Sequence, residues 1–84
     1  MSKVKIIKLG TDSCPPCLVM KPELKKLRKA HKNWIIKDID IDKNPGKYKD
    51  ILSIPVTKIC VGKKHKRIVG GLSKEDIEKV VRSL

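Results

Sequence analysis

Two cysteines separated by two residues, Cys14 and Cys17, are the residues whose type and spacing best suit chemistry. Such a pair can carry out thiol–disulfide exchange, or it can supply half of a structural zinc site, which needs four ligands. Neither a second cysteine pair at this spacing nor a nearby histidine follows, so a zinc-binding interaction domain is the less favoured interpretation. The pattern therefore favours a redox-active pair without a metal.

The expected position of the pair, after a strand and at the start of a helix, gives the two thiols different roles. A thiol at a helix N-terminus faces unpaired backbone N–H groups and the positive end of the helix dipole, which lower its pKa from about 8.5. Cys14 is therefore the predicted nucleophile, and Cys17, one turn later on the buried face, is the predicted resolving thiol. Pro15 and Pro16 have no N–H, so Cys14 can accept hydrogen bonds only from Cys17 and beyond. We therefore expect a smaller decrease of the Cys14 pKa and a pair that acts as a reductant.

A strand, a helix and a second strand must position these cysteines. Residues Val4–Leu9 form a short apolar, β-branched run before Gly10, which predicts a buried strand. Apolar residues recur at three- and four-residue spacings from Pro15 to about Ala30, which predicts a helix. Residues Trp34–Ile41 again resemble a strand. This order requires the two strands to lie parallel, joined by a right-handed crossover.

The second half of the sequence predicts a connector and a hairpin. A short helix is expected around Tyr48 to Leu52. Residues Val56–Val61 and Lys66–Val69 flank a glycine-containing loop at Gly62–His65, which predicts two antiparallel strands. The hairpin would complete a four-stranded mixed sheet.

The last helix has a clear start signal. Ser73 is the expected N-cap, and Asp76, three residues later, is the acid of a capping box. Ile77, Val80, Val81 and Leu84 follow on one face of this helix. The predicted fold class is therefore α/β, with the order β-α-β-(short α)-β-β-α.

Length and composition limit the architecture. With 84 residues, of which 39% are hydrophobic, we expect a single domain over residues 1–84. The longest apolar runs are pairs and triplets, far below the roughly 20 residues that span a bilayer, so we expect no membrane segment. The first nine residues lack the apolar core of a secretory signal, which predicts a cytoplasmic location.

The net charge of +12 favours acidic partners. Trp34 and Tyr48 are too few and too isolated for a base-stacking platform, so nucleic-acid binding is a less favoured interpretation, which steeply salt-dependent binding would support. We expect a basic rim near the cysteines that speeds encounter with acidic partners. Its candidates are Lys21, Lys25, Lys63, Lys64 and Lys66.

Several further motifs resemble the thioredoxin family, in a short form that lacks the leading strand and helix. Pro22, five residues after Cys17, matches the proline that kinks the active-site helix of the family. Residues Ile41–Gly46 resemble the stretch after its second strand, Ile54-Pro55 resembles its cis-proline dipeptide, and Gly70-Gly71-Leu72-Ser73 resembles its glycine turn. The resemblance covers nearly the whole chain.

The resemblance implies a monomeric thiol–disulfide oxidoreductase that reduces protein disulfides, uses no cofactor and is recycled by a reductase of the thioredoxin-reductase type. It also implies that the bond before Pro55 is cis, that Ile54 offers its backbone to an extended substrate, and that Gly70 leaves room for substrate side chains. A glutaredoxin-like, glutathione-dependent enzyme is the alternative. It is less favoured because no Tyr or Phe follows Cys14 and no Thr precedes Ile54.

Two positions depart from the family in the sign of their charge. The family carries a buried acid six residues before the nucleophilic cysteine and a lysine in the neighbouring strand, whereas this chain has Lys8 and Asp38 there. The two side chains could meet across adjacent strands beneath Cys17, or both could reach solvent. If they meet, Asp38 could accept the proton of Cys17 through a water molecule.

Three other residues receive structural interpretations. Cys60 lies within a strand pattern and is expected to be a small buried hydrophobic residue. His31 and His65 lie in basic, loop-like surroundings and are expected at the surface.

Overall fold

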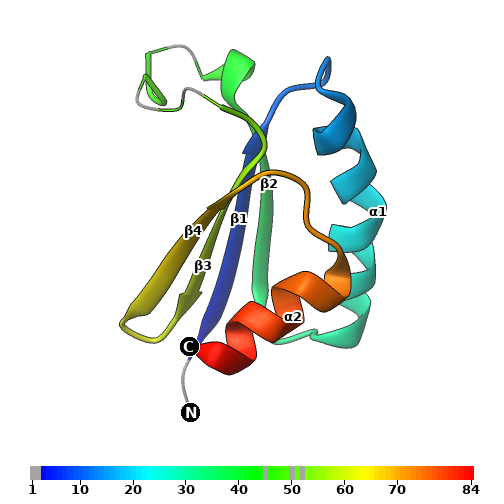
Figure 1. The fold of residues 1–84 in the computed structure, drawn as a ribbon, viewed down its shortest axis with the longest axis vertical. Helices are drawn as coiled ribbons and strands as arrows, with labels where there is room; N and C mark the ends of the chain where they lie inside the picture. The colour runs from blue at the N-terminus through cyan, green and yellow to red at the C-terminus, as the bar shows by residue number, and fades with distance from the viewer. Residues whose placement is uncertain (1–2, 45, 50, 52) are drawn as a thin grey trace.

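A computed structural model describes residues 3–44, 46–49, 51 and 53–84. Its elements are β1 (Val4–Gly10), α1 (Pro15–Ala30), β2 (Ile35–Asp40), the 3-10 helix η1 (Ile41–Lys43), β3 (Val56–Val61), β4 (Lys64–Val69) and α2 (Lys74–Ser83). Figure 1 shows α1 and α2 packed on the same face of one sheet. This arrangement confirms the predicted α/β class.

The four strands form a mixed sheet in the order β2-β1-β3-β4. β1 pairs with β2 in parallel and β3 pairs with β4 antiparallel, as the sequence predicts, and the structure adds that β1 pairs with β3 antiparallel. Strand side chains alternate between the two faces, so every second residue of β1 and β3 points toward the helices. The hydrophobic core lies on that side and consists of Ile6, Met20, Leu24, Leu27, Ile59 and Ile77. Each such buried aliphatic side chain contributes about 1.5 to 3 kcal/mol to folding.

The helix that carries the cysteines begins as the sequence predicts. Cys14 is its N-cap, and Pro15 and Pro16 occupy the first two positions, where a missing N–H leaves no intrahelical bond unmade. The helix continues past Pro22 and ends at His31, whose N–H donates to the carbonyl of Leu27 at 2.8 Å.

The second helix is held at its start and against α1. Ser73 Oγ accepts from the N–H of Asp76, and Asp76 Oδ2 accepts from the N–H of Ser73, both at 3.1 Å, which confirms the capping box. His31 Nε2 lies 2.6 Å from Glu78 Oε2, and its ring stacks on Trp34 with 3.7 Å between centroids. His31 is therefore partly buried, with 28% of its side chain exposed, because it joins the C-terminus of α1 to α2.

The connector after β2 differs from the prediction. A helical turn lies earlier than expected, at Ile41–Lys43, because the Asp40 side chain caps it by accepting from the N–H of Asp42 at 2.9 Å. The expected helix around Tyr48 to Leu52 is not present at its described residues, where the N–H of Ile51 closes a turn to the carbonyl of Tyr48 at 3.1 Å. Asp50 and Leu52 of that segment, and Pro45 of the preceding stretch, lie outside the described residues.

The hairpin is tighter than predicted. Val61 pairs with Lys64, which leaves Gly62 and Lys63 as a two-residue turn, and β4 begins two residues before the expected Lys66. Gly62 has φ +61°, a left-handed conformation that glycine adopts easily. A glycine at the first position of a two-residue turn matches the twist of the flanking strands, so this turn is preferred over a longer loop.

Candidate active site

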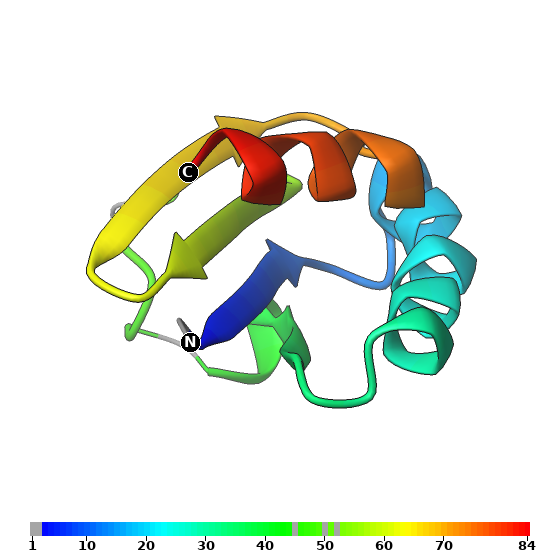
Figure 2. The same cartoon turned by 90° about the horizontal axis from the view of Figure 1, so that it is seen from below.

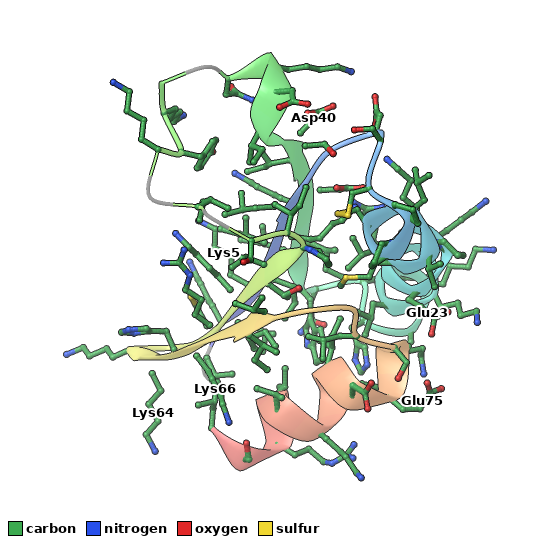
Figure 3. The ribbon with its side chains drawn as sticks, turned by 45° about the horizontal axis from the view of Figure 1, so that its top comes forward. Lys5, Glu23, Asp40, Lys64, Lys66 and Glu75 are labelled. Carbon is green, nitrogen blue, oxygen red and sulfur yellow. A yellow bond between two sulfur atoms is a disulfide. The ribbon has the colours of Figure 1, made fainter. Side chains whose placement is uncertain are left out.

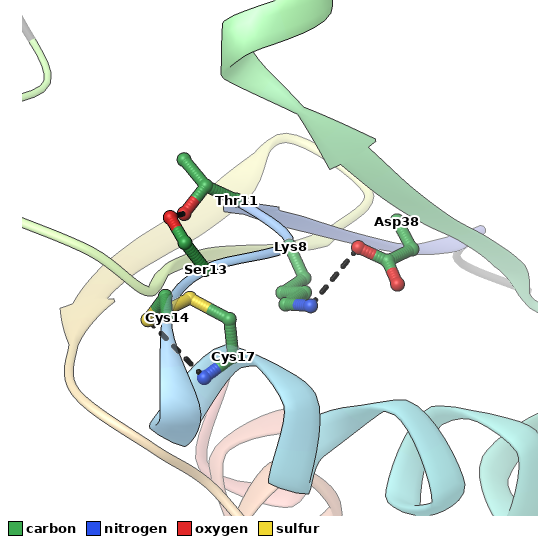
Figure 4. Close-up of a disulfide and its surroundings, with 6 residues drawn as sticks. All are labelled: Lys8, Thr11, Ser13, Cys14, Cys17 and Asp38. Carbon is green, nitrogen blue, oxygen red and sulfur yellow. Dashed lines mark hydrogen bonds and ion pairs between the residues drawn. A yellow bond between two sulfur atoms is a disulfide. The ribbon is translucent and has the colours of Figure 1, made fainter.

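The two cysteines lie where β1 ends and α1 begins, and they form a disulfide with 5.2 Å between their Cα atoms (Figure 4). The structure therefore holds the oxidised form of the pair. Cys14 is 8% exposed, whereas Cys17 is fully buried. Of the two residues only Cys14 retains any exposure, which is the asymmetry that the expected roles of nucleophile and resolving thiol require.

The hydrogen bonding of Cys14 follows from the two prolines. The N–H of Cys17 donates to Cys14 Sγ at 3.3 Å. Neither Pro15 nor Pro16 can donate, so Cys17 supplies the first N–H of the helix that is available to this sulfur. A thiolate at Cys14 would therefore receive a hydrogen bond from the helix, but fewer than a helix start without prolines offers.

Lys8 and Asp38 form an ion pair beneath the disulfide (Figure 4). They face each other in the parallel register of β1 and β2, and Lys8 Nζ lies 3.1 Å from Asp38 Oδ1. The Lys8 side chain is 2% exposed and that of Asp38 is 23% exposed. The second carboxylate oxygen lies 3.4 Å from Nζ of Lys21, a solvent-exposed lysine on α1. Of the two arrangements left open by the sequence, the structure has the one in which the charges meet.

Gly10 allows Lys8 and Cys17 to share one small space. A Cβ atom at this position would lie 2.6 Å from Cys17 Sγ and 3.4 Å from Cε of Lys8. A side chain there would overlap with the sulfur, because a Cβ atom is essentially never found closer than 3.0 Å to such an atom. Sequence reasoning treated Gly10 as a strand boundary and missed this packing role.

Thr57 is a second residue that the sequence reasoning missed. It faces Lys8 across β1 and β3, so Asp38, Lys8 and Thr57 form one row across three strands on the side of the helices. Thr57 is fully buried, and its hydroxyl oxygen has no hydrogen-bond partner among the residues that the structure describes. Its position in an apolar strand pattern offered no signal, because only the strand register brings it beside Lys8.

Solvent reaches this row from the side of Asp38. A cavity of about 140 Å³ is lined by Lys8, Gly10, Lys21 and Asp38, together with residues of the loop after β1 and of η1. The ammonium of Lys8 is buried, but the carboxylate of Asp38 borders the cavity. A water molecule in this cavity can therefore contact Asp38, and Gly10, which packs against Cys17 Sγ, lines the same cavity.

The residues expected to contact substrate lie in two segments that a backbone hydrogen bond joins. The peptide bond between Ile54 and Pro55 is cis, and the carbonyl of Pro55 accepts from the N–H of Gly70 at 2.8 Å. Gly70 has φ +109°, which disfavours other residues, and a Cβ there would meet no atom within 4 Å. A Cβ at Gly71 would lie 4.0 Å from Cβ of Pro16. The glycine turn thus connects the proline loop to the cysteine loop.

The hairpin lysines do not belong to the predicted basic rim. The N–H of Gly62, in the hairpin turn, donates to the carbonyl of Lys3 at 2.9 Å, so the turn lies beside the start of β1. Cys14 follows the opposite end of that strand, and Figure 3 shows Lys64 at the hairpin, away from α1. The prediction was therefore wrong for Lys63 and Lys64, whereas Lys21 contacts Asp38.

The described residues give little support to the alternative of a metal site. Within residues 3–44, 46–49, 51 and 53–84, no three side chains of Cys, His, Asp or Glu gather in a way that could hold a metal ion. The remaining cysteine, Cys60, is a half-buried free thiol in β3.

Among the residues that the structure describes, no helix is long and apolar enough to cross a membrane.

Comparison with protein families gives one match, to the thioredoxin family model over residues 1–83. No curated protein matches the sequence significantly. Among solved structures, chloroplastic thioredoxin z is similar with a TM-score of 0.86 and 25% sequence identity, over 96% of this chain and 77% of that one.

Two further solved structures have the same fold. Oxidised mitochondrial thioredoxin 3 from Saccharomyces cerevisiae has a TM-score of 0.78 and 23% identity, over 100% of this chain and 81% of that one. Thioredoxin-2 of the malaria parasite has a TM-score of 0.85 and 20% identity, over 99% and 84% of the two chains. Because the similar structures include chloroplastic and mitochondrial proteins, the cytoplasmic location of this chain stays a prediction.

Proposed function

The chain belongs to the thioredoxin family and is a thiol–disulfide oxidoreductase, and on this basis we propose that it reduces disulfides in protein substrates through Cys14 and Cys17. The observation that carries the proposal is the disulfide at the first turn of α1, in which Cys14 retains some exposure and Cys17 is fully buried.

The reaction takes two exchange steps. The Cys14 thiolate attacks one sulfur of the substrate disulfide, a mixed disulfide forms at Cys14, and the other substrate sulfur leaves as a thiolate. Cys17 then loses its proton and attacks the Cys14 sulfur, which forms the Cys14–Cys17 disulfide and releases the second substrate sulfur. The substrate gains two electrons. A reductase of the thioredoxin-reductase type returns the pair to the dithiol.

Substrate binding would use the loop next to the disulfide. Ile54, before the cis proline, is half-buried, and its backbone can pair with an extended substrate segment as an added strand does. The open space at Gly70 accommodates the side chains of that segment. Pro55 is fully buried and joined to Gly70 by a backbone hydrogen bond, so it keeps the two contact residues together.

The second step needs a group that takes the proton of the buried Cys17, and Asp38 is our candidate. Its carboxylate borders a cavity that admits water, so a water molecule can carry the proton between them. Lys8 is an ammonium and cannot accept this proton. It anchors the Asp38 carboxylate at 3.1 Å, and its positive charge near the sulfur favours the thiolate form of Cys17.

An insulin-reduction assay with dithiothreitol tests the proposed function. The parent protein should accelerate precipitation of the insulin B chain, Cys14→Ser should be inactive, and Cys17→Ser should accumulate the mixed disulfide. No acceleration by the parent, or equal acceleration by Cys14→Ser, would refute it. A second series compares NADPH with thioredoxin reductase against glutathione with glutathione reductase. Turnover with glutathione alone would support the glutaredoxin-like alternative.

A further inference from the structure

The sheet has a second face, opposite α1 and α2 (Figure 2), and the strand register places two rows of side chains on it. From β2 to β4, one row is Lys37, Ile7, Lys58 and Arg67, and the next is Ile35, Lys5, Cys60 and His65. We call these eight residues the open face. It is separate from the disulfide, because Cys14 and Cys17 contact the helix side of the sheet.

The open face concentrates positive charge. Three lysines, an arginine and a histidine occupy five of its eight positions, and none of the eight is acidic. The acids of β2, Asp38 and Asp40, alternate to the other face of the sheet. Neighbouring strands lie about 4.8 Å apart, so cationic residues paired on neighbouring strands, such as Lys58 and Arg67, stand side by side.

A hollow in the open face adds a place for a ligand. It has a volume of about 330 Å³ and is lined by Lys58, Cys60, His65, Lys66 and Arg67. Lys58, His65 and Arg67 are the basic residues of the open face in this lining, whereas Lys66 stands opposite the core residue Ile59 and directs its side chain to the helix side. A phosphate group placed there would face the ammonium of Lys58 and the ring of His65.

We propose that the open face binds the phosphate backbone of nucleic acid, independently of base sequence and of the redox reaction. Lysine side chains are flexible point charges that suit phosphates, and the cores of protein–protein interfaces are depleted in lysine. The open face carries no Phe, Tyr or Trp, so bases would not stack on it. The sequence made nucleic-acid binding a less favoured interpretation because it lacks an aromatic platform for bases. Contacts that reach only phosphates do not need such a platform.

The test uses two triple variants with the same net charge. One removes three lysines of the open face (Lys5→Gln, Lys37→Gln, Lys58→Gln). The matched control removes three exposed lysines on or just after α1 (Lys25→Gln, Lys29→Gln, Lys32→Gln). Binding to a fluorescein-labelled DNA of about 20 nucleotides, single-stranded and duplex, is followed by anisotropy between about 50 and 200 mM salt.

We expect the parent and the control variant to bind with a steep salt dependence. Each lost phosphate contact lowers the slope of log K against log salt by about 0.7 for single strands and 0.9 for duplex, so the open-face variant should lose about 2 to 3. Its affinity at the lowest salt should fall at least about tenfold, while insulin reduction stays at the parental rate.

Three results would overturn the proposal. If the parent does not bind DNA at the lowest salt, the face has no such role. If both triple variants lose the same affinity and slope, net charge alone causes the binding. If poly-L-glutamate of equal charge binds the open face more tightly than DNA does, the face serves an acidic polypeptide instead.

Discussion

Replacing Asp38 with asparagine should slow the resolution of the mixed disulfide at neutral pH and leave the first attack by Cys14 nearly unchanged. A positioned general base accelerates proton transfer by about 10² to 10⁴. Asp38 would act through a water molecule, since its carboxylate pairs with Lys8 at 3.1 Å and Lys21 at 3.4 Å. We therefore expect the rate of resolution to fall by about 10- to 100-fold, which is at or below the lower limit of that range.

The same substitution also leaves a buried charge without its partner. Lys8 is 2% exposed, and removing one member of a buried pair costs about 3 to 5 kcal/mol, less here because 23% of the Asp38 side chain is exposed. The double variant Lys8→Met with Asp38→Asn removes both charges and separates this destabilisation from the loss of the base. It should regain most of the stability and resolve the mixed disulfide at least as slowly as Asp38→Asn. Lys21→Gln, which removes the exposed partner, is the matched control and should stay near the parental rate.

The two steps are measured separately by single-turnover mixing of the reduced protein with a disulfide peptide. Acid quenching and mass spectrometry then follow the mixed disulfide at Cys14. The reasoning is refuted if Asp38→Asn and the double variant both resolve the mixed disulfide at the parental rate. In that case Cys17 would be deprotonated by solvent or by the leaving thiolate.

Three further predictions concern stability. Gly10→Ala would place a Cβ 2.6 Å from Cys17 Sγ, so it should lower the free energy of unfolding of the oxidised protein by about 1 to 3 kcal/mol in urea titrations; unchanged stability would contradict the packing role of Gly10. Thr57→Val removes a buried hydroxyl that has no partner among the described residues, and thermal unfolding should show a gain of about 1 kcal/mol; a loss would mean that the hydroxyl is hydrogen-bonded in solution. His31 and Lys74 hold the pKa of Glu78 below its usual 4.5, so this carboxylate stabilises the fold above about pH 4.5 and its contribution is lost as the pH falls through the lowered pKa. Glu78→Gln should therefore flatten the decrease of unfolding free energy below about pH 5, and an unaltered profile would exclude this contribution.

Local signals in the sequence were sufficient for most elements. The helix that starts at Cys14 and Pro15 is marked by apolar spacing and by prolines that only a first turn accepts. The capping box at Ser73 involves groups three residues apart, so it can form from local geometry alone. Because these signals depend on only a few neighbouring residues, both helices begin in the structure where the sequence predicts.

Predictions were weaker where several local solutions compete. Gly62 allows both a two-residue turn and a longer loop, and the twist and pairing of β3 and β4 select the shorter one. Asp40 could extend β2 or cap a new turn, and its hydrogen bond to the N–H of Asp42 stabilises the 3-10 helix there. The first choice depends on the pairing of neighbouring strands and the second on which of two local hydrogen-bonding patterns forms.

The sequence by itself determined the redox pair, the order of the elements and the charge exchange between Lys8 and Asp38. Only the tertiary structure decided that these two charges meet beneath Cys17, that Thr57 joins their row and that Gly10 must stay without a side chain. The physical reason is the strand register, since a shift of one residue would turn Lys8 or Asp38 to the opposite face of the sheet. That register is set by the burial of residues such as Ile6, Ile59 and Leu24, which come together only when the whole chain has folded.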